Sequence, residues 1–269
     1  MSFDDFALDP RLLKNLQKIG FEHPTPIQSA TISHALAGRD ILGSAETGTG
    51  KTAAFLLPLL QKLLDTPRAG EPRALIVVPT RELALQVADH AMQLSRGLKL
   101  EIATIYGGVS LKPQEEALKR GADVIIATPG RLLDHVERRN VTFGALRILV
   151  LDEADRMLDQ GFLPDIRRIV RLLPKKRQTM LFSATLQPIV DLSRDVTHEP
   201  VRVEVETAAT PDAITQVLYP VPEHLKFEVL QRLLEDNSLY SVLVFARTKH
   251  RADRLARNLQ RAKIDAAVI

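Results

Sequence analysis

One segment, residues 45–52, constrains this chain more than any other feature of its sequence. It reads Ala45-Glu46-Thr47-Gly48-Thr49-Gly50-Lys51-Thr52, follows a short apolar run and opens a long apolar helix. The two glycines allow the backbone N–H groups to curl around an anion, and the helix start adds its positive dipole end. The lysine and the final threonine supply the phosphate and Mg²⁺ contacts of a P-loop. The alternative is a flexible turn that caps a helix.

Short apolar runs alternate with helical patterns through residues 1–206. The predicted strands cover residues 40–42, 74–78, 102–106, 124–127, 148–151 and 180–182. The predicted helices cover residues 12–19, 27–37, 52–64, 82–95, 113–120, 130–138 and 166–173. Alternation of this kind predicts an α/β fold in which helices flank a parallel sheet.

Polar, glycine or proline motifs follow the predicted strands. Besides the P-loop, they are Pro79-Thr80-Arg81-Glu82, Gly107-Gly108, Thr128-Pro129-Gly130-Arg131, Asp152-Glu153-Ala154-Asp155 and Ser183-Ala184-Thr185. In open parallel sheets, ligands bind beyond the carboxyl ends of the strands. Loops at that edge are polar in any α/β protein, but polarity alone does not account for the arginines, paired glycines and paired carboxylates together.

Two adjacent carboxylates, Asp152 and Glu153, come directly after the apolar strand 148–151. In a P-loop protein a carboxylate at this place holds Mg²⁺. Its neighbour is suited to orient or deprotonate an attacking water. The alternative is an acidic first helical turn that the helix dipole favours. The P-loop earlier in the chain favours the catalytic interpretation.

The pattern changes near residue 206. Residues 207–212 lack periodicity and are predicted to be a linker, after a first domain at 1–206. Residues 213–269 then begin a second alternation, with strands at 214–219, 242–245 and from 265, and helices at 226–235 and 249–261. This part is shorter than a usual domain of about 100 residues. We therefore expect an incomplete second α/β domain.

Composition excludes several classes of protein. The chain has no cysteine, which removes disulfides, thiolate zinc sites and thiol catalysis. It has no apolar run of the roughly 18 residues that a transmembrane helix needs, and no signal peptide, so we expect a cytoplasmic protein without membrane contact. A net charge of +3 permits nucleic-acid binding, whereas an aromatic content of 4% argues against base stacking as a broad recognition mode.

The motifs together resemble those of the DEAD-box RNA helicases. The tetrad Asp152-Glu153-Ala154-Asp155 is similar to the motif that names this family, and Ala45 in place of the usual first glycine of a P-loop is the family's own variant. The segment 20–28 resembles the family's adenine-recognising Q motif, with Phe3 as its upstream aromatic. The similarity covers the whole chain and is closest in character to bacterial, RhlE-like members.

This resemblance implies a RecA-like P-loop NTPase that uses ATP and Mg²⁺, followed by a partial second RecA-like domain. It implies that Lys51, Asp152 and Glu153 are catalytic and that Thr52 and Asp152 hold Mg²⁺. Gln28 is expected to pair with the adenine edge, and Phe21 to stack on the purine, although a core role for Phe21 is the alternative. The residues expected to bind the nucleotide are Phe21, Gln28, Ala45, Glu46, Thr47, Gly48, Thr49, Gly50, Lys51 and Thr52.

The resemblance also implies that RNA is the partner, bound through its backbone and without sequence specificity. The residues expected to contact RNA are Pro79, Thr80, Arg81, Gly107, Gly108, Thr128, Pro129, Gly130 and Arg131. Asp155, Ser183 and Thr185 are expected to couple the nucleotide site to unwinding. The predicted activity is ATP-dependent unwinding of short RNA duplexes.

In this family a second domain supplies arginine fingers, and the later motifs of that domain do not occur in the chain. We therefore expect nucleotide binding with slow turnover and no unwinding. One alternative is an ATP-dependent RNA clamp or chaperone. A DNA helicase or another P-loop ATPase is a second alternative, against which the Q motif and the Asp-Glu-Ala-Asp tetrad argue.

Overall fold

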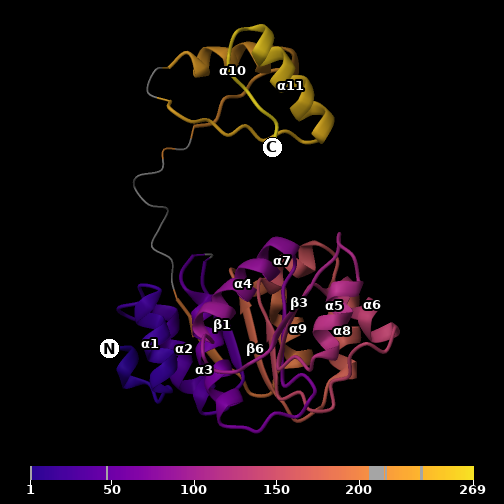
Figure 1. Ribbon diagram of the computed structural model, residues 1–269. Helices are drawn as coiled ribbons and strands as arrows, with labels where there is room; N and C mark the ends of the chain where they lie inside the picture. Colours follow the sequence, from indigo (N-terminus) through magenta and orange to yellow (C-terminus); the bar gives the residue numbers. More distant parts are fainter. Residues whose placement is uncertain (1, 47, 206–214, 216, 237–238) are drawn as a thin grey trace. The chain divides into compact units, whose positions relative to one another are not determined.

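A seven-stranded parallel sheet carries the larger part of the chain in the computed structural model (Figure 1). The structure describes residues 2–46, 48–205, 215, 217–236 and 239–269. The chain divides into two units, Met1–Ala209 and Thr210–Ile269. Each unit is described by itself, and the predicted linker 207–212 lies outside the described residues.

The sheet of the first unit confirms the predicted parallel α/β fold. Its strand order is β3-β4-β2-β5-β6-β1-β7. The strands are β1 (Ile41–Ser44), β2 (Ala74–Val77), β3 (Ile102–Ile105), β4 (Val124–Ala127), β5 (Ile148–Leu151), β6 (Gln178–Ser183) and β7 (Val201–Glu204). The last of these was not predicted. It pairs with β1 at the edge of the sheet, and its charged residues Arg202 and Glu204 face solvent, so it lacks the continuous apolar run of a buried strand.

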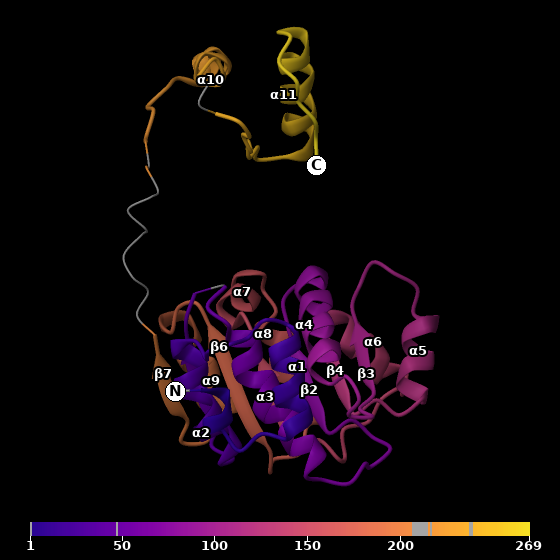
Figure 2. The ribbon, with the colours of Figure 1, turned by 60° about the vertical axis from the view of Figure 1, so that its left-hand side comes forward.

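Helices cover both faces of the sheet, as Figures 1 and 2 show from two directions. One layer consists of η1 (Phe3–Asp5), α1 (Pro10–Lys18), α2 (Pro26–Leu36), α3 (Lys51–Leu64) and α4 (Arg81–Leu94). The other consists of α5 (Lys112–Lys119), α6 (Pro129–Glu137), α7 (Ala154–Asp159), α8 (Leu163–Leu172), η2 (Gln187–Ile189) and α9 (Val190–Val196). The short helices α7 and α9 were not predicted, since each spans barely two turns and shows little periodicity.

Alternate residues of each central strand pack into opposite layers of the core. In β2, Ala74 and Ile76 contact the cluster under α1–α4, whereas Leu75 and Val77 contact the cluster under α5–α9. This is the two-residue period expected of a strand. Because both faces are covered, the strands are apolar throughout, which is why they were recognisable in the sequence.

Gly43 in the middle of β1 makes room for an aromatic pair. A Cβ at this position would lie 2.6 Å from Cδ1 of Phe182 in the neighbouring strand β6. The Phe182 ring lies 5.5 Å from the ring of Phe55 in α3. The glycine therefore lets α3, the helix that follows the P-loop, pack closely on the sheet.

A buried ion pair fixes the opposite, amino-terminal edge of the sheet. Arg73, just before β2, donates from Nη2 to Oδ1 of Asp123, just before β4, at 2.8 Å, and both side chains are only 2% exposed. Arg73 Nη1 also donates to the carbonyls of Leu63 and Thr66, and Asp123 accepts from the backbone N–H of Glu101. One guanidinium thus ties α3, β2, β3 and β4 together.

The second unit contains η3 (Glu223–Leu225), α10 (Lys226–Leu234) and α11 (Lys249–Arg261), which confirms both helices predicted there. The strands predicted at 242–245 and from 265 were wrong, and the described residues of 214–219 form none. A strand needs a hydrogen-bonded neighbour, and the apolar run is instead exposed, with Phe245 88% accessible. No helix within the described residues of either unit is long and apolar enough to cross a membrane.

We predict that Arg73→Met destabilises the first unit by about 3–5 kcal/mol, because the buried Asp123 then keeps only the half-exposed Arg68, at 3.2 Å, as a charged partner. Arg194→Met is the matched control, since Arg194 pairs with Asp191 on the surface and should change the free energy of unfolding by less than about 1 kcal/mol. Urea denaturation measures both. Equal losses in the two variants would contradict the role assigned to the buried pair.

Candidate functional site

The strand order separates the predicted motifs into two adjacent groups along one edge of the sheet. The Arg81, Gly-Gly and Arg131 motifs follow β2, β3 and β4, which are neighbours. The P-loop, the carboxylate tetrad and the Ser183 motif follow β1, β5 and β6, which are also neighbours. The two groups meet where β2 pairs with β5. The carboxyl edge is therefore one continuous surface with a junction between Arg81 and Asp152.

The described part of the P-loop has the backbone that its glycines predict. Gly48 and Gly50 lie in the left-handed region, with φ of 89° and 94°, and Gly50 caps the N-terminus of α3. Thr49 Oγ1 donates to the carbonyl of Glu46 at 2.7 Å, which closes the turn. Buried Lys51 donates from Nζ to the carbonyl of Ala45 at 2.7 Å, so the ammonium lies across the loop. Thr47 lies outside the described residues.

Gln28 lies behind the P-loop and is fully buried. Its Nε2 donates to the carbonyl of Gly50 at 3.0 Å, and its Oε1 accepts from the backbone N–H of Thr25 at 3.0 Å. A side chain at position 50 would collide with this amide. The structure thus places Gln28 against the nucleotide loop, and these two bonds leave a second N–H on Nε2 and a second lone pair on Oε1 for pairing with adenine.

A cavity of about 480 Å³ brings five of the ten predicted nucleotide residues together with the two carboxylates after β5. Phe21, Lys51, Thr52, Asp152 and Glu153 line it, although they come from three separate segments of the chain. Phe21 is half-buried and its ring lies 6.3 Å from that of Phe3, so it faces the cavity and packs on the core at once.

One face of α4 completes this cavity and was missed by sequence reasoning. Gln86, Asp89 and His90 line it, at the spacing that places residues on the same side of a helix. The sequence offered one indication of these three residues, which is their i, i+3, i+4 spacing one helical turn after the Arg81 motif.

The Asp152 carboxylate is buried, with its Oδ1 accepting from the backbone N–H of Glu153 at 3.0 Å. Burial raises its pKa to about 6, against the lowering effect of Lys51 and that N–H. A buried carboxylate that shares a cavity with a threonine hydroxyl is a fitting donor set for Mg²⁺, which prefers oxygen ligands and keeps several waters or phosphates. The described residues contain no group of three or more acidic, histidine or cysteine side chains that would hold a metal without a nucleotide.

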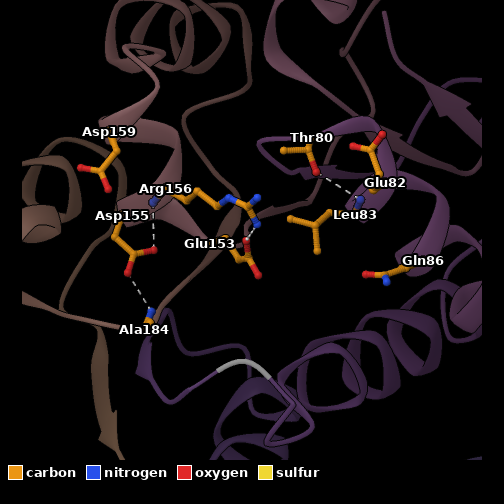
Figure 3. A pocket seen from close by; sticks show the side chains of 9 residues that line it. All are labelled: Thr80, Glu82, Leu83, Gln86, Glu153, Asp155, Arg156, Asp159 and Ala184. Atoms are coloured by element: carbon orange, nitrogen blue, oxygen red, sulfur yellow. Dashed lines mark hydrogen bonds and ion pairs between the residues drawn. The ribbon is translucent and has the colours of Figure 1, made fainter. Parts of the chain in front are cut away.

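Glu153 occupies a backbone conformation that residues other than glycine rarely adopt, with φ 51° and ψ 50°. This turn ends β5 and starts α7, and it aims the carboxylate into a second cavity of about 470 Å³ (Figure 3). There Glu153 Oε2 accepts from Arg156 Nη1 at 3.0 Å. Strain of this kind is typical of functional positions.

Asp155 joins the carboxylate tetrad to the loop after β6. Its Oδ2 accepts from the backbone N–H of Ala184 and of Thr185 at 3.1 Å and from Thr185 Oγ1 at 3.2 Å. Burial alone would raise the pKa of Asp155, but the hydrogen bonds from Ser183, Arg156 and Thr185 hold it below its ordinary value. Asp155 and Thr185 are therefore in direct contact. The Ser183 hydroxyl donates to the Thr185 carbonyl at 2.7 Å and so shapes the same loop.

The residues expected to contact RNA form the start of two helices and one glycine loop. Pro79 precedes Thr80, which caps α4 through a bond from Leu83 N to its hydroxyl, and Thr128 and Pro129 begin α6. Gly130 is exposed with open space around it.

The three motifs touch one another through their arginines. The Arg81 guanidinium lies 5.1 Å above the Tyr106 ring, next to Gly107 and Gly108. Arg131 donates from Nη1 to the carbonyl of Val109 at 3.0 Å. The structure therefore gathers all the predicted RNA residues at β2, β3 and β4, separate from the nucleotide cavity.

Known proteins share these features. A family model described as DEAD/DEAH box helicase matches residues 25–192. A crystal structure of a DEAD box protein from the hyperthermophile Methanococcus jannaschii is similar with a TM-score of 0.72 and 36% identity, covering 100% of this chain and 72% of that one.

Three curated relatives are RNA helicases by name. The chain is 42% identical to the ATP-dependent RNA helicase RhlB of Pseudomonas syringae pv. tomato, 45% to SrmB of Escherichia coli and 41% to CshA of Bacillus subtilis. These matches cover 98%, 98% and 96% of the chain, but 69%, 61% and 52% of the respective relatives. The narrower expectation of an RhlE-like member stays a prediction. Because the family model matches more than half of the chain's residues, the chain belongs to the DEAD/DEAH box helicase family.

Proposed function

We propose that this chain is the ATP-binding part of an ATP-dependent RNA helicase that acts on short duplexes in the cytoplasm. The observation that supports this most is the junction of β2 and β5, where a nucleotide cavity adjoins a surface of arginines and glycines. The sheet thus carries two binding functions side by side. ATP hydrolysis in the nucleotide cavity can then change how tightly the neighbouring surface binds RNA.

In the nucleotide cavity, a positive charge and backbone N–H groups bind the phosphates, and side-chain oxygens are available to a metal ion. Lys51 exchanges its bond to the Ala45 carbonyl for the β- and γ-phosphates, and Gly48 and Gly50 leave the loop N–H groups free to face them. Thr52 and Asp152 would hold Mg²⁺, which would supply positive charge to the phosphates. Phe21 contacts the base. Gln28 senses it through the Gly50 carbonyl.

Glu153 handles the attacking water. Its strained turn places the carboxylate between the nucleotide cavity and the cavity of Figure 3, since it lines both. Asp155 links hydrolysis to the rest of the sheet edge, because its hydrogen bonds to Ala184 and Thr185 connect α7 to the loop after β6. A change at Glu153 that moves α7 also moves this loop.

The RNA end is the group of loops after β2, β3 and β4 that carry Arg81, Gly107–Gly108 and Arg131. We assign to it the binding of an RNA phosphate backbone. Arg81 and Arg131 offer guanidinium groups and the exposed glycines allow close approach of the strand, so binding depends on charge and shape rather than on base identity. A contact of this kind bends one strand of a duplex and breaks a few local base pairs.

We further propose that this chain alone turns ATP over slowly. The described residues of the nucleotide cavity include no arginine, and an arginine finger contributes about 10³–10⁵ in rate where one is present. The second candidate function, an ATP-dependent RNA clamp, follows from this absence. Phosphate release with and without single-stranded RNA, beside a longer chain with a complete second domain, separates the two. Equal stimulation of both chains would contradict the proposal.

We predict that Lys51→Ala lowers the affinity for a non-hydrolysable ATP analogue about a hundredfold, because the phosphates lose a buried charged donor. Calorimetric titration measures it. Lys119→Ala is the matched control on the exposed face of α5 and should leave the affinity unchanged. Unchanged binding by Lys51→Ala would rule out the P-loop assignment.

We predict that Glu153→Gln keeps analogue binding but slows ATP hydrolysis by about 10²–10⁴ in a chain with a complete second domain, since the amide cannot accept the proton of water. Steady-state phosphate release measures the rate. Glu116→Gln, on the surface of α5, is the control. Turnover by Glu153→Gln at the unsubstituted rate would show that another group handles the water.

We predict a pH dependence of stability from Asp152 in Mg²⁺-free buffer. Its pKa is about 6 in the folded chain, above its ordinary value of 3.8, so the folded state binds an extra proton between these values. The free energy of unfolding should therefore fall as pH rises through this window, by roughly 1–3 kcal/mol in total. Asp152→Asn should remove this part of the pH profile. Identical profiles for the two proteins in urea denaturation would contradict the shifted pKa.

A further inference from the structure

The glycine loop after β3 is held differently from the other two loops at the RNA end. The loops after β2 and β4 lead directly into α4 and α6, whose first turns fix them. After β3, residues 106–111 separate the strand from α5 and have no helical or strand structure. Side chains from elsewhere therefore set the position of Gly107 and Gly108.

A buried amide supplies one of these contacts. Gln114 in α5 is only 6% exposed, and its Nε2 donates to the carbonyl of Tyr106 at 3.0 Å. This carbonyl directly precedes Gly107. The bond anchors the start of the loop to α5, while the Arg81 guanidinium lies over the ring of the same tyrosine.

A buried histidine fixes the orientation of this amide. His135 in α6 is fully buried, and its Nε2 lies 3.2 Å from Gln114 Oε1. Its Nδ1 lies 3.1 Å from Asn140 Nδ2, which can only donate, so Nδ1 accepts and the proton is on Nε2. His135 therefore donates to Gln114 Oε1, which leaves Nε2 of the amide to face Tyr106. Burial and the charge of Arg131 lower the pKa of His135 and so keep the ring neutral.

This chain of Asn140, His135 and Gln114 belongs neither to the nucleotide cavity nor to the predicted RNA contacts. Its buried polar atoms are hydrogen-bonded within the chain and to Glu115, whose Oε1 accepts from Asn140 Nδ2 at 3.2 Å, and its last bond ends on the glycine loop. A buried polar network that is fully satisfied makes one arrangement rigid. We propose that Gln114, oriented by His135 and Asn140, is a positioning residue that holds the Gly107–Gly108 loop in the shape that receives an RNA phosphate backbone.

The inference rests on the proposed RNA function, and Gln114→Leu tests it. Leucine fills a similar volume but cannot donate to the Tyr106 carbonyl. The probe is a fluorescein-labelled single-stranded polyuridylate, bound in the presence of a non-hydrolysable ATP analogue and followed by fluorescence anisotropy. We expect RNA affinity to fall about tenfold and analogue affinity to stay within about twofold. Hydrogen exchange of the amides in residues 107–110 should become faster.

The matched control is Gln260→Leu in α11, where the exposed amide donates to the carbonyl of Ala266 at 2.9 Å within the second unit. It should change neither affinity nor exchange. Asn140→Ala is the second variant, because it removes only the far member of the chain and keeps the Gln114 bond. We expect it to weaken RNA binding about threefold, with analogue affinity unchanged.

The outcomes separate the two proposals. Unchanged RNA affinity and unchanged exchange in Gln114→Leu would overturn the positioning role. A parallel loss of RNA and analogue affinity in both Gln114→Leu and Asn140→Ala would overturn it too, since that indicates general destabilisation. Absence of RNA binding by the unsubstituted chain would refute the RNA function, while the exchange of residues 107–110 would still decide whether Gln114 holds the loop.

Discussion

The parallel pairing of seven strands is the constraint on which the rest of this structure depends. Parallel strands all end at the same edge, so every loop that follows a strand must meet the others there. The opposite edge is closed by buried ions such as Arg73 and Asp123, which hold the strand starts together. The buried ion pair thus lies at one edge of the sheet and the binding motifs lie at the other.

Within the nucleotide group, a few short hydrogen bonds join the P-loop, the carboxylate tetrad and the loop after β6 to neighbouring residues. Arg156 donates to Glu153, and Asp155 accepts from the backbone N–H of Ala184 (Figure 3). Asp155 also accepts from Thr185. Gln28 and the Gly50 carbonyl form a similar bridge behind the P-loop. Each bridge joins a residue next to the nucleotide to a separate element. Hydrogen bonds of this kind transmit small displacements because the groups they join are short side chains on rigid strands and helices.

The sequence predicted buried elements well and exposed ones poorly. The strands 124–127 and 148–151 were placed to the residue, because both faces of the sheet are covered and the apolar runs are continuous. The edge strand β7 was missed because charges interrupt it. The strand predicted at 242–245 was wrong for the opposite reason. Its residues are apolar, but no neighbouring strand in the described residues pairs with them. An apolar segment favours a strand, but it forms one only where a neighbouring strand hydrogen-bonds to its backbone.

The sequence by itself determined which residues carry the chemistry, since the P-loop glycines, Lys51 and the carboxylate pair are defined by local spacing and by the strand that precedes them. Only the tertiary structure decided how these motifs are arranged. The strand order that separates the nucleotide group from the Arg81 and Arg131 group depends on contacts between distant segments. So do the burial that raises the pKa of Asp152 and the polar chain that ends at Gln114. Local sequence patterns identify the chemical groups that can act. The surroundings of those groups depend on residues that are distant in the sequence and that the sheet brings together.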